Sequence, residues 1–214
     1  MNPTRPAVAL SPAWRRRARS LALAIALGAA GCSLLRGPTT TPTTFYVLSA
    51  TSESGQAPPG RDLALGLGPI TLPPYLDRPQ MVRRVAPNEL AFDEFNRWSE
   101  PLKQNFERVL GSDLDRLIGV DRLIAYPWYS NTPMDYAVAV TVTRFELQPS
   151  GDVALDSRWA ISSANGKPFL NRETHLSRPA NSPAEVAGAM SGMTGDLARD
   201  IAIAIRELDA KHPR

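Results

Sequence analysis

Cysteine and histidine are scarce in this chain of 214 residues, which contains one cysteine, Cys32, and two histidines, His175 and His212. A single thiol cannot form a disulfide within the chain, and neither histidine has a partner at a metal-binding spacing. No glycine-rich phosphate loop is present either, because Gly66 and Gly68 lack the third glycine and the following helix. We therefore expect no metal, no dissociable cofactor and no enzyme activity.

Acidic residues are missing from the first 31 positions, where basic residues come first and an apolar stretch follows. The arginines of this segment are Arg5, Arg15, Arg16, Arg17 and Arg19. Residues 21–30 are uncharged and lead into small residues, which is the order of a bacterial secretory signal peptide. A helix of this length would cover only about half of a ~30 Å hydrocarbon core, so a permanent transmembrane helix is the weaker interpretation.

Cys32 stands where such a signal would be cut, directly after Ala29, Ala30 and Gly31. This order resembles a lipobox, although leucine is more usual than alanine at the position of Ala29. The resemblance implies recognition of Ala29, Ala30 and Gly31 by signal peptidase II and attachment of a diacylglyceryl group to Cys32. Because Ser33 follows instead of aspartate, it also implies sorting to the periplasmic face of the outer membrane. The alternative is an ordinary buried cysteine in a signal-anchor helix.

Removing the signal changes the charge of the protein. The chain has 24 lysines and arginines against 21 acidic residues, and losing the five arginines of the signal leaves 19 against 21, a net charge of about −2. No long basic run remains in the mature part, so we expect no nucleic-acid partner.

The chain divides into three parts. Residues 1–31 are the predicted lipoprotein signal peptide, and residues 32–44 are a lipidated tether rich in threonine and proline. Residues 45–210 have the length and apolar content of one domain with a real core.

Alternating and helical apolar patterns predict a mixed α/β fold for residues 45–210. We expect strands at 44–50, 62–72, 80–85, 89–92, 135–148, 152–162 and 169–177, and helices at 99–118 and 182–210. Gly68 and Pro69 predict a bulge or an edge, and Ser182 with Glu185 forms a capping box for the last helix. The prediction is a mixed β-sheet covered by two long amphipathic helices.

Four short motifs make the sequence more specific. The segments "FYVLS", "LPPYLDRPQMVRR", "RWSEPL" and "AYPW", followed by a closing amphipathic helix, stand in this order behind the lipobox. In this combination the chain resembles the PqiC/YmbA family of ABC-type transport auxiliary lipoproteins. The resemblance implies a three-layer α/β domain like that of anticodon-binding domains, without an RNA role. It also implies an outer-membrane lipoprotein that works with an MCE-domain protein in lipid transport and membrane integrity.

The two most distinctive motifs supply the candidate site. Tyr75, Leu76, Asp77, Arg78 and Trp98 match them, and the functional interpretation is a surface that contacts the partner. The alternative is architectural, with Asp77 or Arg78 capping the helix and Trp98 packing beneath it.

Three functions remain to be separated. An adaptor needs only a surface patch, a lipid carrier needs an apolar cavity of several hundred Å³, and an envelope hydrolase needs a nucleophile with an oriented base. His175 would be the only base for the hydrolase. The transported lipid, its direction of movement and any homo-oligomer stay open.

Overall fold

Strands make up most of the folded part of the protein, as the alternating patterns predict. A computed structural model describes residues 41–53, 63–129 and 131–211, so Ala29 to Ser33 and His212 lie outside the described residues. The strands are β1 Thr44–Tyr46, β2 Ala64–Thr71, β3 Gln80–Ala86, β4 Glu89–Trp98, β5 Arg122–Ala125, β6 Tyr136–Leu147, β7 Asp152–Ser162 and β8 Pro168–Pro179. The helices are the short 3-10 turn η1, Pro74–Leu76, and the α-helices α2, Leu102–Ile118, and α3, Pro183–Lys211.

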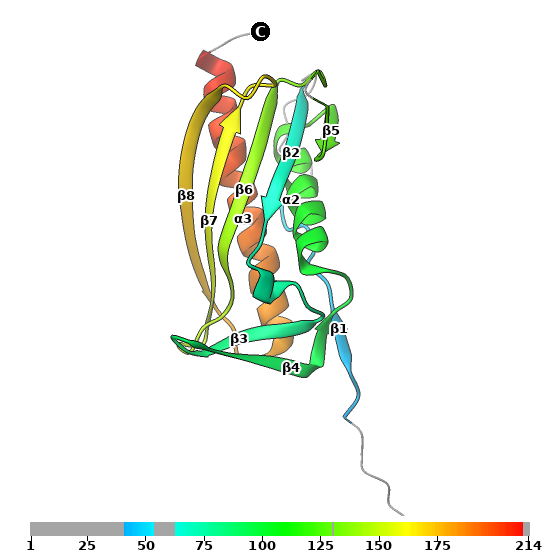
Figure 1. Cartoon of the computed structure of the whole chain (residues 1–214), viewed down its shortest axis with the longest axis vertical. Helices are drawn as coiled ribbons and strands as arrows, with labels where there is room; N and C mark the ends of the chain where they lie inside the picture. Colours follow the sequence, from blue (N-terminus) through cyan, green and yellow to red (C-terminus); the bar gives the residue numbers. More distant parts are fainter. Residues whose placement is uncertain (1–40, 54–62, 130, 212–214) are drawn as a thin grey trace, which may run out of the picture. The chain divides into compact units, whose positions relative to one another are not determined.

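All of these strands join one open mixed sheet. β6 lies at its centre, with β2 parallel on one side and the antiparallel meander β7 and β8 on the other, while β5 pairs parallel with β2. The β3–β4 hairpin meets the end of β6 through Arg83 and Leu147, and β1 adds parallel to β4. We call β1, β4 and β3 the ribbon; it forms one end of the domain, and β5 lies toward the other end (Figure 1).

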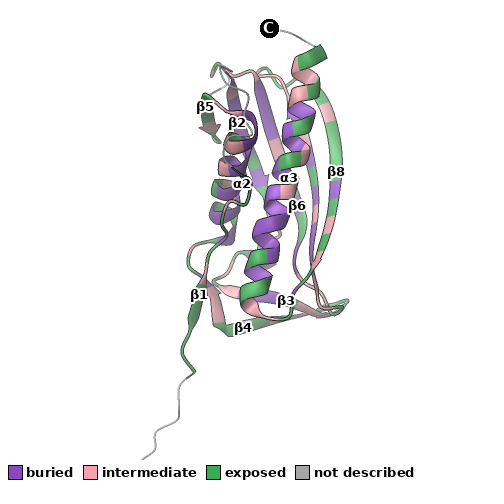
Figure 2. Ribbon diagram, turned by 180° about the vertical axis from the view of Figure 1, so that it is seen from behind, coloured by how far each residue is buried: buried purple, intermediate pink, exposed green. Residues whose placement is uncertain are grey.

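Both long helices cover the same face of the sheet (Figures 1 and 2), α2 over β2 and α3 over β6, β7 and β8. The single mixed α/β domain with two amphipathic helices is thus confirmed, but its layers are two, one of strands and one of helices, where the resemblance implied three. The reason lies in the strands: along β6, Val138, Val140 and Val142 are buried, whereas Thr141 and Thr143 on the opposite face are exposed. One apolar face needs only one layer of helices.

The predicted irregularity in β2 is present. The pairing of β2 with β6 shifts register between Leu67 and Ile70, and Gly68 between them has a φ of 125°. A Cβ atom at Gly68 would also lie 2.5 Å from Cβ of Tyr126, so this position requires glycine.

Residues 47–52, which we call the strap, leave β1 and run along the two helices. Both N–H groups of Thr51 and Ser52 donate to Asp113 Oδ1 of α2, at 2.9 and 2.7 Å, and Ser49 N–H donates to Ser191 Oγ of α3 at 3.1 Å. Leu48 is buried. The strap therefore joins the start of the domain to both helices.

Candidate partner-binding site

The segment between β2 and β3 contains the most distinctive motif of the chain and is stiffened by proline. Pro73, Pro74 and Pro79 restrict its backbone, and η1 is closed by hydrogen bonds from Leu76 N–H to the Pro73 carbonyl and from Asp77 N–H to the Pro74 carbonyl, at 3.0 and 3.1 Å. A single fixed turn thus presents the side chains of the motif.

Tyr75 is fastened to the sheet beneath it. Its hydroxyl donates to Glu146 Oε2 at 2.9 Å, while Arg84 Nε donates to Glu146 Oε1 at 3.0 Å. The guanidinium of Arg84 also lies 5.9 Å from the centre of the Tyr75 ring. Partial burial and the charge of Glu146 raise the pKa of Tyr75 to about 12. The tyrosine is therefore a neutral donor to a buried carboxylate at neutral pH.

Glu146 is only 1% exposed, although it carries a charge. Besides Tyr75 and Arg84, it accepts hydrogen bonds from Phe145 N–H at 2.9 Å and from Gln148 Nε2 at 3.2 Å. A buried carboxylate is tolerated when its oxygens are paired in this way. The motif thus rests on a fully bonded polar cluster of Tyr75, Arg84 and Glu146, which we call the polar cluster.

Arg78 and Asp77 differ in how they are held. Arg78 Nε donates to the Tyr75 carbonyl at 2.9 Å, and its guanidinium carbon lies 3.8 Å from the centre of the Phe92 ring in β4. Asp77 is exposed. The segment therefore offers a free carboxylate beside a cation that is already stacked on an aromatic ring.

Leu76 and Trp98 are not surface residues. Leu76 is 3% exposed and Trp98 4%, and both belong to the main core. For these two positions the surface prediction is corrected, because their apolar side chains pack beneath the segment, as the architectural alternative proposed for Trp98. The helix-capping part of that alternative is wrong as well: Pro101 precedes α2 and no side chain caps this helix.

The described residues contain no group of three or more histidine, cysteine or acidic side chains that could hold a metal ion. His175 is exposed on β8, where its Nδ1 lies 2.8 Å from Asp156 Oδ1, and this hydrogen bond raises the pKa of the histidine. Asp113 and Asp115 point apart on α2, the first to the strap and the second to solvent.

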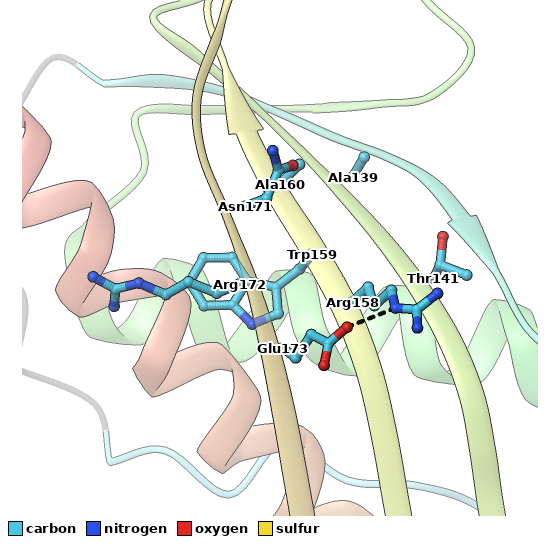
Figure 3. A pocket seen from close by; sticks show the side chains of 8 residues that line it. All are labelled: Ala139, Thr141, Arg158, Trp159, Ala160, Asn171, Arg172 and Glu173. Carbon is cyan, nitrogen blue, oxygen red and sulfur yellow. Dashed lines mark hydrogen bonds and ion pairs between the residues drawn. The ribbon is translucent and has the colours of Figure 1, made fainter.

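Two hollows on the surface test the carrier hypothesis. A depression of about 530 Å³ lies over β6, β7 and β8. Its lining is mixed: Ala139, Trp159 and Ala160 are apolar, whereas Arg158 and Glu173 form an ion pair at 2.8 Å (Figure 3). A more apolar groove of about 180 Å³ lies between β3 and the start of α3, where Met81 and Val186 line it. The first is open to solvent and contains an ion pair, and the second is small for an acyl chain.

No helix among the described residues combines the length and the apolar character needed to span a membrane, and this includes α3 with its 29 residues.

Comparison with known proteins places the chain in a family. Residues 46–202 match the family model described as ABC-type transport auxiliary lipoprotein component. No curated protein matches. Among solved structures, a Xanthomonas campestris protein of family DUF330 is 18% identical, with a TM-score of 0.66 over 78% of this chain and 99% of that one. An uncharacterized protein, also 18% identical, has a TM-score of 0.62 over 77% of this chain and 99% of that chain.

These two structures share the fold of this chain. The family match spans β2 to β8, α2 and most of α3. The resemblance seen in the motifs is thereby confirmed: the protein belongs to the family of ABC-type transport auxiliary lipoprotein components.

Proposed function

We propose that the protein is a lipid-anchored subunit on the periplasmic face of the outer membrane, where it docks an MCE-domain protein of a lipid transport system. Signal peptidase II would cut after Gly31, Cys32 would carry the lipid, and Ser33 would direct sorting. The family match supports a transport auxiliary role, and the order of basic, apolar and small residues before Cys32 supports the anchor.

The filled interior favours an adaptor over a lipid carrier. Between sheet and helices, Phe106 of α2 meets Phe145 of β6 edge to face at 5.6 Å, and both rings have no exposed surface. Leu114, Leu155 and Leu197 are equally buried. Packing of this kind leaves the described core without a volume for an acyl chain, and this is the observation on which the adaptor proposal rests.

The segment of Tyr75, Asp77 and Arg78 is the docking surface we propose. The polar cluster and the Phe92 stack hold it in one conformation, so binding would cost little conformational entropy. The carboxylate of Asp77 is exposed, so we expect a basic group on the partner to face it.

A crosslinked pull-down from membranes tests this proposal. Asp77→Arg should lower recovery of the MCE-domain protein about tenfold, which corresponds to ~1.4 kcal/mol, because it reverses the charge at the surface. Asp121→Arg is the matched control, since Asp121 is exposed in the turn after α2, and should leave recovery unchanged.

Two results would oppose the proposal. Full recovery with a stable Asp77→Arg protein would exclude this segment as the docking surface. If the protein without its covalent lipid anchor is purified and one phospholipid is found per chain, this would instead support the carrier. Cys32→Ser supplies the test of the anchor: the precursor should stay uncut and unacylated, and a mature, membrane-bound product would refute lipidation.

A further inference from the structure

Three large apolar side chains stand exposed in the ribbon and at the start of the strap, close to the point where the tether enters the domain. Phe45, Val47 and Phe95 are 62%, 46% and 48% exposed. We call them the ribbon patch. Exposed phenylalanine is costly in water, so a group of such residues indicates a binding surface.

The pairing of β1 with β4 brings the three residues into one part of the domain. Phe45 pairs with Arg97, Val47 follows β1 directly, and Phe95 lies in β4 two residues before Arg97. Tyr46, next to Phe45, donates its Oη to Asn96 Oδ1 at 3.2 Å. The polar contact is therefore made by Tyr46, while the three apolar side chains stay exposed.

The local structure holds Phe95 outward. In β4 the pairing with β3 jumps from Arg97 to Asp93, which leaves residues 94–96 as a bulge. Asp93 Oδ1 accepts hydrogen bonds from the N–H groups of Phe95 and Asn96, both at 3.0 Å. A bulge fixed by a side chain redirects the residue it contains, so the exposure of Phe95 is built into the strand.

The tether determines which partner lies closest to this patch. Phe45 is 13 residues after Cys32, and a chain of that length reaches at most about 45 Å. A short flexible linker gives its two ends a mutual effective concentration in the millimolar range. A lipid-anchored Cys32 therefore keeps the ribbon patch within about 45 Å of the bilayer, at a local concentration at which even weak contacts form.

We infer that the ribbon patch inserts into the surface of the membrane that carries the lipid anchor. This inference rests on the lipid attachment proposed above. The rings of Phe45 and Phe95 suit the boundary between headgroups and acyl chains, where amphipathic surfaces bury apolar side chains. Arg97 is paired with Glu94 at 2.9 Å, so the contact is apolar and not electrostatic.

Quenching by spin-labelled lipids tests the inference on the lipidated full-length mature protein. The sulphur of Cys32 is blocked by the lipid, so Val47→Cys supplies the only free thiol for an environment-sensitive fluorophore. In vesicles of phosphatidylethanolamine and phosphatidylglycerol with acyl-chain nitroxides, we expect several-fold stronger quenching at position 47 than for Tyr129→Cys. Tyr129 is 83% exposed and comes four residues after β5, the strand that lies toward the other end of the domain (Figure 1).

The second arm removes the patch and keeps the anchor. Adding Phe45→Ser and Phe95→Ser to Val47→Cys should abolish the extra quenching at position 47, while sedimentation with vesicles and the melting temperature stay close to those of Val47→Cys. Raising the salt to 0.5 M should leave the quenching unchanged.

Two outcomes overturn the inference: equal quenching at positions 47 and 129, or a label at 47 that is shielded from water without lipid quenching, as a protein partner or a second copy would cause. Loss of vesicle sedimentation in every variant would refute the lipid anchor instead, so the two failures are distinguishable.

Discussion

Glu146 determines the geometry of the candidate site through its hydrogen bonds. Its carboxylate is buried, and Tyr75 of η1 and Arg84 of β3 both donate hydrogen bonds to it. Breaking a buried charged pair costs more than the pair contributes, because the remaining charge stays without a partner. The polar cluster therefore fixes how the segment of Tyr75 sits on the sheet.

The pKa of Tyr75 predicts a stability change at alkaline pH. A folded-state pKa near 12 lies above the unfolded value of 10, so the stabilisation is complete below pH 10 and is lost as the pH rises toward 12. At pH 8 we expect the free energy of unfolding of wild type to be about 1–2 kcal/mol higher than that of Tyr75→Phe. At pH 11 this difference should be smaller by about 1 kcal/mol.

Urea unfolding of both proteins at the two pH values measures this difference. Tyr126→Phe is the control, because Tyr126 is 54% exposed, and it should follow wild type throughout. A gap between wild type and Tyr75→Phe that stays constant up to pH 11 would contradict the proposed hydrogen bond to Glu146.

At the scale of elements, the strap links strand, helices and tether. Its backbone N–H groups bind side chains of both helices instead of a neighbouring strand, and Arg116 of α2 donates to the Ser52 carbonyl at 3.1 Å. Asp113 is fully buried and serves two of these N–H groups at once. A force applied to the tether would therefore be transmitted through β1 and the strap to both helices.

Removal of Asp113 tests how firmly the strap is held. Asp113→Ala should lower the free energy of unfolding by about 2–3 kcal/mol, because the N–H groups of Thr51 and Ser52, the second of them buried, lose a charged acceptor. Asp115→Ala removes the same group from the exposed side of α2 and should cost less than about 0.5 kcal/mol. Chemical denaturation measures both, and amide hydrogen exchange at Thr51 and Ser52 should accelerate only in the first. Equal behaviour of the two variants would show that the strap is held by other contacts.

The sequence predicted the elements with the strongest periodicity and missed those set by tertiary contacts. β6, β7 and α3 lie almost where their apolar patterns placed them. Of the predicted capping box, the Ser182 half is present, since Glu185 N–H donates to Ser182 Oγ at 3.2 Å, whereas the Glu185 carboxylate accepts from Asn181 N–H at 2.8 Å. The predicted strand 44–50 ends at Tyr46, because the strap bonds to the helices. β5 has four residues, too few for a visible alternation. The first helix begins at Leu102, not at 99, because Ser99 N–H donates to the Tyr46 carbonyl.

The candidate site was predicted less well for the same physical reason. The motif gave the positions of Tyr75 and Arg78, but their partners, Glu146 and Phe92, come from other strands. In sequence, Glu146 is one polar residue within an alternating strand and is indistinguishable from an exposed one. Asp113 likewise reads as one of two acidic residues on a helix, and only the strap distinguishes it.

At the scale of the whole molecule, the ribbon and the β5 end lie apart along the long axis of the domain (Figure 1). If the ribbon patch touches the bilayer, β5 and the aromatic loop after it extend toward the periplasm, with Tyr126 and Tyr129 exposed. The docking segment then lies near the membrane end, beside the ribbon. The partner would have to approach the outer membrane closely in order to reach Asp77.

The length of the tether distinguishes a domain on the membrane from one held away from it. Deleting residues 37–42 shortens the stretch between Cys32 and Phe45 to a reach of about 25 Å. A domain whose ribbon already rests on the bilayer needs no longer tether, so we expect recovery of the MCE-domain protein within twofold of wild type and unchanged quenching at position 47. Lengthening by six glycine and serine residues should have equally little effect, since the effective concentration falls only slowly with linker length.

A domain that must stand clear of the membrane to meet its partner would respond differently: the deletion would lower recovery severalfold and the insertion would restore it. That pattern, with normal acylation of Cys32, would place the ribbon patch away from the bilayer.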